Sequence, residues 1–131
     1  MDALWTLADW AGRILFAIVF VNSGIFHLRR HQYATGYAKS KGVPLAGLAV
    51  AITGLQILVG ALMIVPGWHP IIGALLLAVF LLPVAVLMHN FWTVTDPAQK
   101  ANDQAHFFKD LALAGAALLY AVALHRQGVP F

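Results

Sequence analysis

The stretch HPIIGALLLAVFLLPVAVLMH, residues 69–89, decides the fold of this chain. Between its two terminal histidines there is no polar side chain at all. A bilayer has a hydrocarbon core of about 30 Å, which about 20 apolar residues cross as a helix. The stretch therefore predicts a helix that spans a membrane.

Three further stretches have the same character. They cover residues 5–28, residues 45–65 and residues 106–124. The turn PGWHP (66–70) is so short that the helices on either side of it should be antiparallel neighbours. The sequence thus predicts an all-α integral membrane bundle of four transmembrane helices, formed by residues 1–131 as a single domain.

The composition agrees with this and excludes several classes of function. Of the 131 residues, 61% are hydrophobic and 10% are charged, whereas a soluble domain has about 25% charged residues. The chain has no cysteine, which excludes disulfides, thiolate metal sites and a cysteine nucleophile. No basic stripe alternates with aromatic residues, so no nucleic-acid partner is expected.

Basic residues predict the orientation. Four lie in the loop 29–44 and one in the loop 90–105, namely Arg29, Arg30, Lys39, Lys41 and Lys100. Loops rich in lysine and arginine stay in the cytoplasm. We therefore expect both loops to be cytoplasmic and both termini to be extracytoplasmic.

Two polar residues lie within the predicted spans. Arg13 and Gln56 should lie at a similar depth, roughly 12–13 Å below the side that carries the termini, at a rise of 1.5 Å per residue. They could form a buried polar pair. Alternatively, the arginine reaches the membrane surface on its long side chain.

A second polar group lies at the opposite membrane surface, around the segment HNFWTVTDPAQKANDQAHFFKD (89–110). Two of its members, His106 and Asp110, are four residues apart and share one face of a helix. We expect a recess here in which His89 lies within roughly 6 Å of Asp110, the reach of one bridging water. The candidate ligand-binding residues are His27, His89, Trp92, His106, Lys109 and Asp110.

Three interpretations of this recess stay open. Histidine and tryptophan are common at a membrane surface for structural reasons alone. Histidine and an acid could also exchange protons with the head group of a quinone, whose ring aromatic side chains could enclose. A metal site formed by His27, His89, His106 and Asp110 is a third reading, but the spacing matches no compact metal motif and no metal is assigned.

The order of the motifs resembles the DoxX family of small bacterial membrane proteins. HNFW (89–92) is followed by QAHFFKDLALAGAALL (104–119), and the earlier segments RILFAIVFVNSGIFHL (13–28) and GLQILVGALMI (54–64) also resemble the family. Two positions differ from its pattern. Gln56 stands where many members carry an acid, and Asp110 stands where asparagine is common.

The resemblance implies a multi-pass protein of the bacterial inner membrane. It implies a membrane subunit or scaffold of a redox assembly, with a soluble or membrane oxidoreductase as its partner, since some members are similar to subunits of thiosulfate:quinone oxidoreductase. A quinone is the one cofactor it suggests. The alternative is an autonomous membrane enzyme or binder that acts on a lipophilic redox molecule through the His, Trp and Asp cluster. An oligomer is compatible with both.

Overall fold

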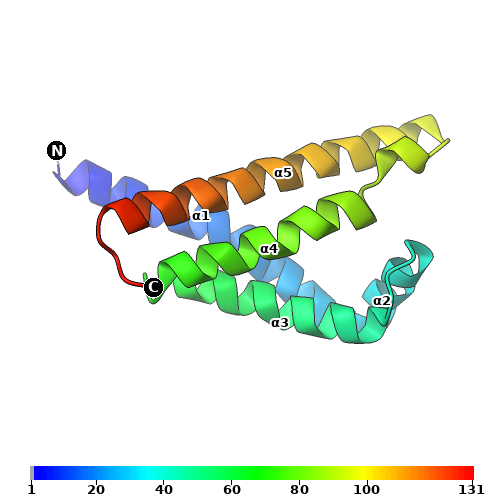
Figure 1. Cartoon of the computed structure of the whole chain (residues 1–131), viewed down its shortest axis with the longest axis horizontal. Coiled ribbons are helices and arrows are strands. Elements are labelled where there is room, and N and C mark those ends of the chain that lie inside the picture. Colours follow the sequence, from blue (N-terminus) through cyan, green and yellow to red (C-terminus); the bar gives the residue numbers. More distant parts are fainter. Residues whose placement is uncertain (1) are drawn as a thin grey trace.

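The computed structural model describes residues 2–131, and all of the regular structure in this range is helical (Figure 1). The elements are α1 (Asp2–Arg29), α2 (His31–Ser40), α3 (Ala46–Ile64), α4 (Pro70–Met88), the short 3₁₀ helix η1 (Phe91–Thr93) and α5 (Pro97–Arg126). Four of them, α1, α3, α4 and α5, are long and apolar enough to cross a membrane. The predicted all-α bundle of four transmembrane helices is confirmed.

The long helices pack in a simple order. Helix α1 lies along α3, α3 along α4, and α4 along α5. Both termini lie at one end of the bundle, called here the terminal end, while α2 and η1 lie at the other, called the α2 end (Figure 1). The two predicted loops therefore share one membrane surface.

Small residues bring the helices close together. A Cβ added to Gly60 of α3 would lie 2.9 Å from the carbonyl oxygen of Gly73 in α4, and one added to Gly54 would lie 2.9 Å from the Cβ of His27 in α1. Such close approach at glycine is typical of helix packing in lipid. The glycine of α5, Gly115, differs, because a Cβ there would meet nothing within 4 Å.

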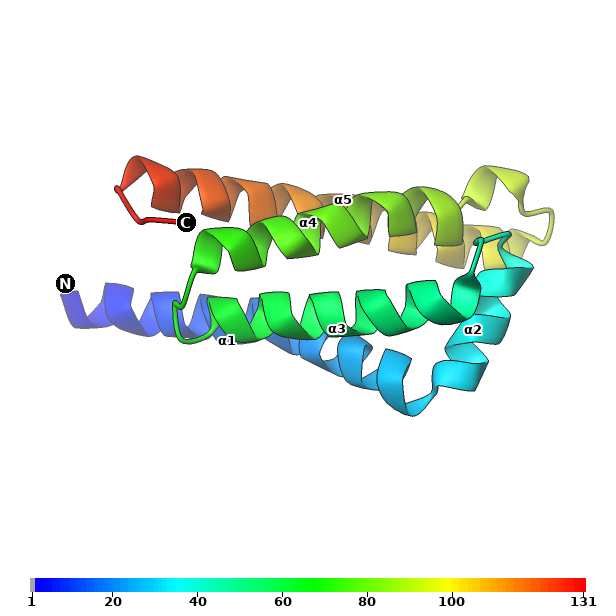
Figure 2. The same ribbon diagram turned by 60° about the horizontal axis from the view of Figure 1, so that its bottom comes forward.

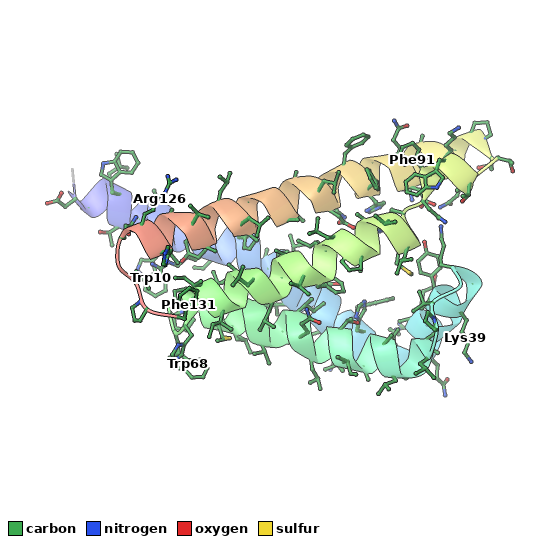
Figure 3. All side chains as sticks on the ribbon, viewed as in Figure 1. Trp10, Lys39, Trp68, Phe91, Arg126 and Phe131 are labelled. Carbon is green, nitrogen blue, oxygen red and sulfur yellow. The ribbon has the colours of Figure 1, made fainter. Side chains whose placement is uncertain are left out.

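Aromatic side chains mark both ends of the bundle. Trp10, Trp68 and Phe131 lie at the terminal end, whereas Phe91 lies at the α2 end (Figure 3). Trp68 and Trp92 are both exposed. Exposed aromatic residues near both ends of long apolar helices are the pattern that anchors a bundle at two membrane surfaces.

The first correction to the sequence prediction is α2, which occupies much of the expected loop 29–44. Its alanines Ala34 and Ala38 are buried, and His31 Nε2 lies 2.8 Å from the carbonyl oxygen of Gly47 in α3. Gly42 follows the C-cap of this helix, and its φ of +76° permits the hydrogen bond from Val43 N to Ala38 O that closes many helices. Tertiary packing, and not local hydrophobicity, holds this segment.

The second correction is the start of α5. The helix begins at Pro97 and not near residue 106. Asp96 is the N-cap and accepts a hydrogen bond from the backbone N–H of Gln99 at 2.8 Å, and Pro97 stands at the first turn, where its missing N–H costs nothing. The first turns of α5 are polar, so hydropathy alone places its start too late.

Candidate functional site

A cavity of about 790 Å³ lies at the α2 end of the bundle. Residues of both α1 and α5 line it, and Figure 2 shows these two helices lying apart from each other toward that end. All five α-helices contribute to its lining, and α2 covers its end through Tyr33, Ala34, Tyr37 and Ala38. Most of the remaining lining residues are apolar.

The cavity is open to the surroundings of the bundle. Val19 and Phe26 of α1 and Val79 and Leu87 of α4 line it and are also exposed on the surface of the chain. These residues belong to membrane-spanning helices. A lipid-soluble molecule could therefore reach the cavity from the bilayer.

Five of the six predicted ligand-binding residues line this cavity: His27, His89, His106, Lys109 and Asp110. The sixth, Trp92, does not. Its ring packs on Phe91 and Phe107 at centroid distances of 5.3 and 5.6 Å, and 52% of the residue is exposed. The expectation that Trp92 belongs to the recess is corrected, because its ring packs on Phe91 and Phe107 and does not line the cavity.

His89 is the centre of the polar group. Its Nε2 lies 3.6 Å from Asp110 Oδ2, which meets the expected limit of roughly 6 Å. Its ring stacks on His106 with the centroids 4.9 Å apart and the planes at 20°. The two imidazoles and the carboxylate thus form one group on the cavity wall.

Two further polar residues of the cavity, Lys109 and His27, lie on opposite sides of it. Lys109 Nζ lies 2.8 Å from His106 Nδ1. Since an ammonium group only donates hydrogen bonds, Nδ1 accepts and the ring proton of His106 is on Nε2. On the opposite side, His27 lies against Gly54, with its Nδ1 3.5 Å from the hydroxyl oxygen of Thr53.

Sequence reasoning missed a second acid beside His89. Asp103 of α5 is 1% exposed, and it accepts hydrogen bonds from Lys41 Nζ at 3.1 Å and Gln99 Nε2 at 2.9 Å. Lys41 also donates to Asn90 Oδ1 at 3.1 Å. Lys41, at the C-terminus of α2, therefore ties that helix to α5.

A signal for this second acid is present in the sequence. Gln99, Asp103, His106 and Asp110 are spaced by four, three and four residues, which places all of them on one face of a helix. The pattern is visible only if α5 is already helical at residue 99. Because the sequence prediction started the helix near residue 106, it left Gln99 and Asp103 outside the helix and missed the shared face.

Tyr37 of α2 adds a hydrogen-bonding group at the end of the cavity. Burial raises the pKa of its phenol above the ordinary value, and the neighbouring Lys41 opposes this shift. The phenol therefore stays protonated at neutral pH and can donate a hydrogen bond.

The proposed pair of Arg13 and Gln56 is wrong. Arg13 forms an ion pair with Asp9 one turn earlier, at 2.7 Å, while Gln56 Nε2 donates to the carbonyl oxygen of Leu76 in α4 at 2.8 Å. The depth estimate took no account of Asp9, which neutralises the arginine within α1. Gln56 instead lines the cavity.

The structure also bears on the metal reading of the recess. Among residues 2–131, no three histidine or acidic side chains come together in a way that could hold a metal ion. The chemistry that the lining offers is hydrogen bonding, proton exchange and aromatic contact.

Comparisons with known proteins agree with the sequence resemblance. The family model described as DoxX matches residues 8–90, which include His27, Lys41 and His89 but not α5. The chain is also 30% identical over 110 residues, 84% of this chain and 78% of the relative, to the inner membrane protein YphA of Escherichia coli (strain K12). No solved structure shows a significant match.

Proposed function

This chain belongs to the DoxX family, and we propose that it is a multi-pass inner-membrane protein that binds a lipid-soluble molecule of the quinone class in its cavity. In this proposal it acts as a membrane subunit or scaffold of a redox assembly. An oxidoreductase would dock at the α2 end, close to the head group of the bound molecule.

The observation that carries the proposal is the cavity itself. Its volume of about 790 Å³ falls within the range of about 300–1,000 Å³ that is typical of small-molecule sites. It combines a mostly apolar lining with hydrogen-bonding groups gathered on one wall, which suits an amphiphile with an apolar tail. The cavity opens at the surface of the membrane-spanning helices, which suits a ligand that is dissolved in the membrane.

The polar wall fits the head group of a quinone. A quinone oxygen accepts hydrogen bonds, and Lys109 and the ring N–H of His106 both donate them. The reduced form carries hydroxyl groups, which could donate to Asp110. The same wall thus has partners for both forms of one ligand.

Binding is tested with the purified protein in mild detergent. Increasing amounts of a short-chain ubiquinone are added, and the quinone retained per folded protein is measured by mass spectrometry. We expect saturable retention, lost in His89→Ala and Lys109→Ala with little change in thermal stability. His125→Ala is the matched control, because His125 is exposed and lies in the last turn of α5, at the terminal end.

Three results would count against the proposal. The first is retention that does not saturate, and the second is equal loss of quinone in His89→Ala and His125→Ala. The third is a loss of stability in His89→Ala with unchanged quinone per folded protein, which would make the recess structural. The partner is tested separately, by identifying proteins that copurify with the intact chain but not with a variant in which Arg29, Arg30 and Lys39 are replaced by glutamine.

A further inference from the structure

His89 lies between two buried acids. Its Nδ1 is 3.8 Å from Asp103 Oδ1, and its Nε2 is 3.6 Å from Asp110 Oδ2. Asp103 is 1% exposed and Asp110 is 5% exposed. The Nδ1 atom is buried and has no hydrogen-bond partner. A ring rotation or a carboxylate movement of less than about 1 Å brings either nitrogen within hydrogen-bond distance of its acid.

The two acids lie on different sides of the cavity wall. Asp110, His89 and His106 line the cavity, whereas Asp103 does not. Asp103 instead contacts Lys41, whose side chain is 16% exposed at the α2 end. One imidazole therefore separates an acid that is linked to the outer surface from an acid that faces the cavity.

We propose that His89 is a proton relay between the aqueous phase at the α2 end and the cavity. This inference deepens the proposed function and rests on it for the identity of the acceptor, an ionisable oxygen of the bound molecule. Asp103 passes protons to His89 from the outer side, and Asp110 receives them on the cavity side. Lys41 exchanges protons with water.

The proton balance is simple. The Lys41 ammonium gives a proton to the Asp103 carboxylate and recovers one from water. Asp103 passes its proton to Nδ1 of His89, while the proton on Nε2 moves to Asp110 and from there to the ligand. One proton leaves water and one reaches the ligand. The imidazole begins as the Nε2–H tautomer and ends as the Nδ1–H tautomer, and rotation of the ring resets it.

His89 directly follows α4, and the charged or titratable groups that face it come from α5 and from the C-terminus of α2. From α5 they are Asp103, His106, Lys109 and Asp110, and from α2 it is Lys41, acting through Asp103. His106 cannot replace His89 in the relay, because its Nδ1 is held by Lys109. His89 is therefore the one member of the stacked pair with a separate acid near each ring nitrogen among the described residues.

The relay is one-sided. Towards the terminal end the cavity is followed by the apolar core, in which Phe20, Ile57 and Leu77 are at most 1% exposed. Tyr120 is a titratable side chain that packs against that core, but it lies with Asp9 and Arg13 at the terminal end and does not line the cavity. Protons exchanged at the cavity should consequently come from the α2 side alone.

The test places a pH-sensitive reporter in the cavity, so that it does not depend on the binding of a quinone. Because the chain has no cysteine, Leu87→Cys provides a single thiol, at a position that lines the cavity and is 47% exposed. The thiol is labelled with a nitrophenol maleimide, whose phenolate absorbs visible light. Full-length protein in detergent is then mixed rapidly with acidic buffer, and the rate of absorbance loss is recorded.

We expect Asp103→Asn and His89→Gln to slow protonation of the reporter by about a hundredfold, the lower part of the usual contribution of a positioned proton donor. The final absorbance should be the same as in the parent protein. Asp96→Asn is the matched control, because it removes the same charge from the same helix, retains a good N-cap and lies outside the relay.

Unchanged rates in either Asp103→Asn or His89→Gln would overturn the relay, since protons would then reach the cavity by another path. Using both variants guards against a folding defect in one of them, and tryptophan fluorescence checks folding of each. A protein that fails to retain quinone yet shows the slowed rates contradicts the proposed function but not the relay. A protein that retains quinone but shows unchanged protonation rates in these variants contradicts the relay and not the proposed function.

Discussion

Replacing Lys41 should destabilise the protein far more than replacing its neighbour Lys39. Lys41 Nζ donates to the buried Asp103 carboxylate and to Asn90, whereas Lys39 is exposed on the outer face of α2. In Lys41→Met the carboxylate of Asp103 loses its charged partner and keeps one neutral donor, Gln99.

The expected loss of folding stability in Lys41→Met follows from the surroundings of Asp103. A hydrogen bond to a charged group contributes about 1.5–3 kcal/mol, and a buried acceptor left unsatisfied costs a similar amount. The Lys41 side chain is 16% exposed and Asp103 keeps Gln99 as a donor, so we expect Lys41→Met to cost about 2–3 kcal/mol, somewhat below the cost of breaking a fully buried pair. Asp103→Asn keeps an acceptor and should cost only about 1 kcal/mol. Lys39→Met should change stability by less than about 0.5 kcal/mol.

The assay is reversible unfolding of the detergent-solubilised protein by sodium dodecyl sulfate, followed by the fluorescence of its four tryptophans. The double variant Lys41→Met with Asp103→Leu should recover most of the loss, because an apolar pair leaves no isolated charge. A cost for Lys41→Met no greater than that for Lys39→Met would refute the reasoning, as would a double variant no more stable than Lys41→Met.

Three further predictions concern the packing, the helix start and the orientation. Gly60→Ala should destabilise the bundle by about 1–3 kcal/mol in the same unfolding assay, because the added Cβ meets a backbone carbonyl of α4. The Cβ added by Gly115→Ala meets nothing within 4 Å, so this variant should be neutral or stabilising by up to about 1 kcal/mol. Asp96→Ala removes the N-cap of α5 and should cost about 1 kcal/mol, with hydrogen exchange increasing only in the first turns of that helix. A cysteine at Ser40 should resist a membrane-impermeant thiol reagent in intact cells, while one at Gln127 reacts; the reverse pattern would invert the predicted orientation.

The sequence predicted best the helices that are apolar without interruption. Helices α3 and α4 begin and end within one residue of the expected spans 45–65 and 69–89. Their limits are set by a proline and a short turn, which hydropathy and turn chemistry both detect. The segment His31–Ser40 gave no such signal, because it is short, polar on average and held by tertiary contacts, chiefly with α3.

The site was predictable only in part, for a related reason. His89, His106 and Asp110 were expected together because they lie near one membrane surface, and local spacing was enough to place two of them on one face. The contact between Lys41 and Asp103 joins residues 62 positions apart, through a helix that the sequence did not indicate. Arg13 was assigned the wrong partner because depth alone was compared and the acid one turn away was left out.

The contact between Lys41 and Asp103 also has a consequence for how the protein is made. Ribosomes add about 5–20 residues each second, so Asp103 follows Lys41 by about 3–12 s. During this interval α2 can be held only through α1 and α3, by contacts such as that between His31 and Gly47. The end of the cavity is thus completed last, when α5 enters the membrane. A lipid or quinone that is already between the first helices at that moment would be enclosed as the chain finishes folding.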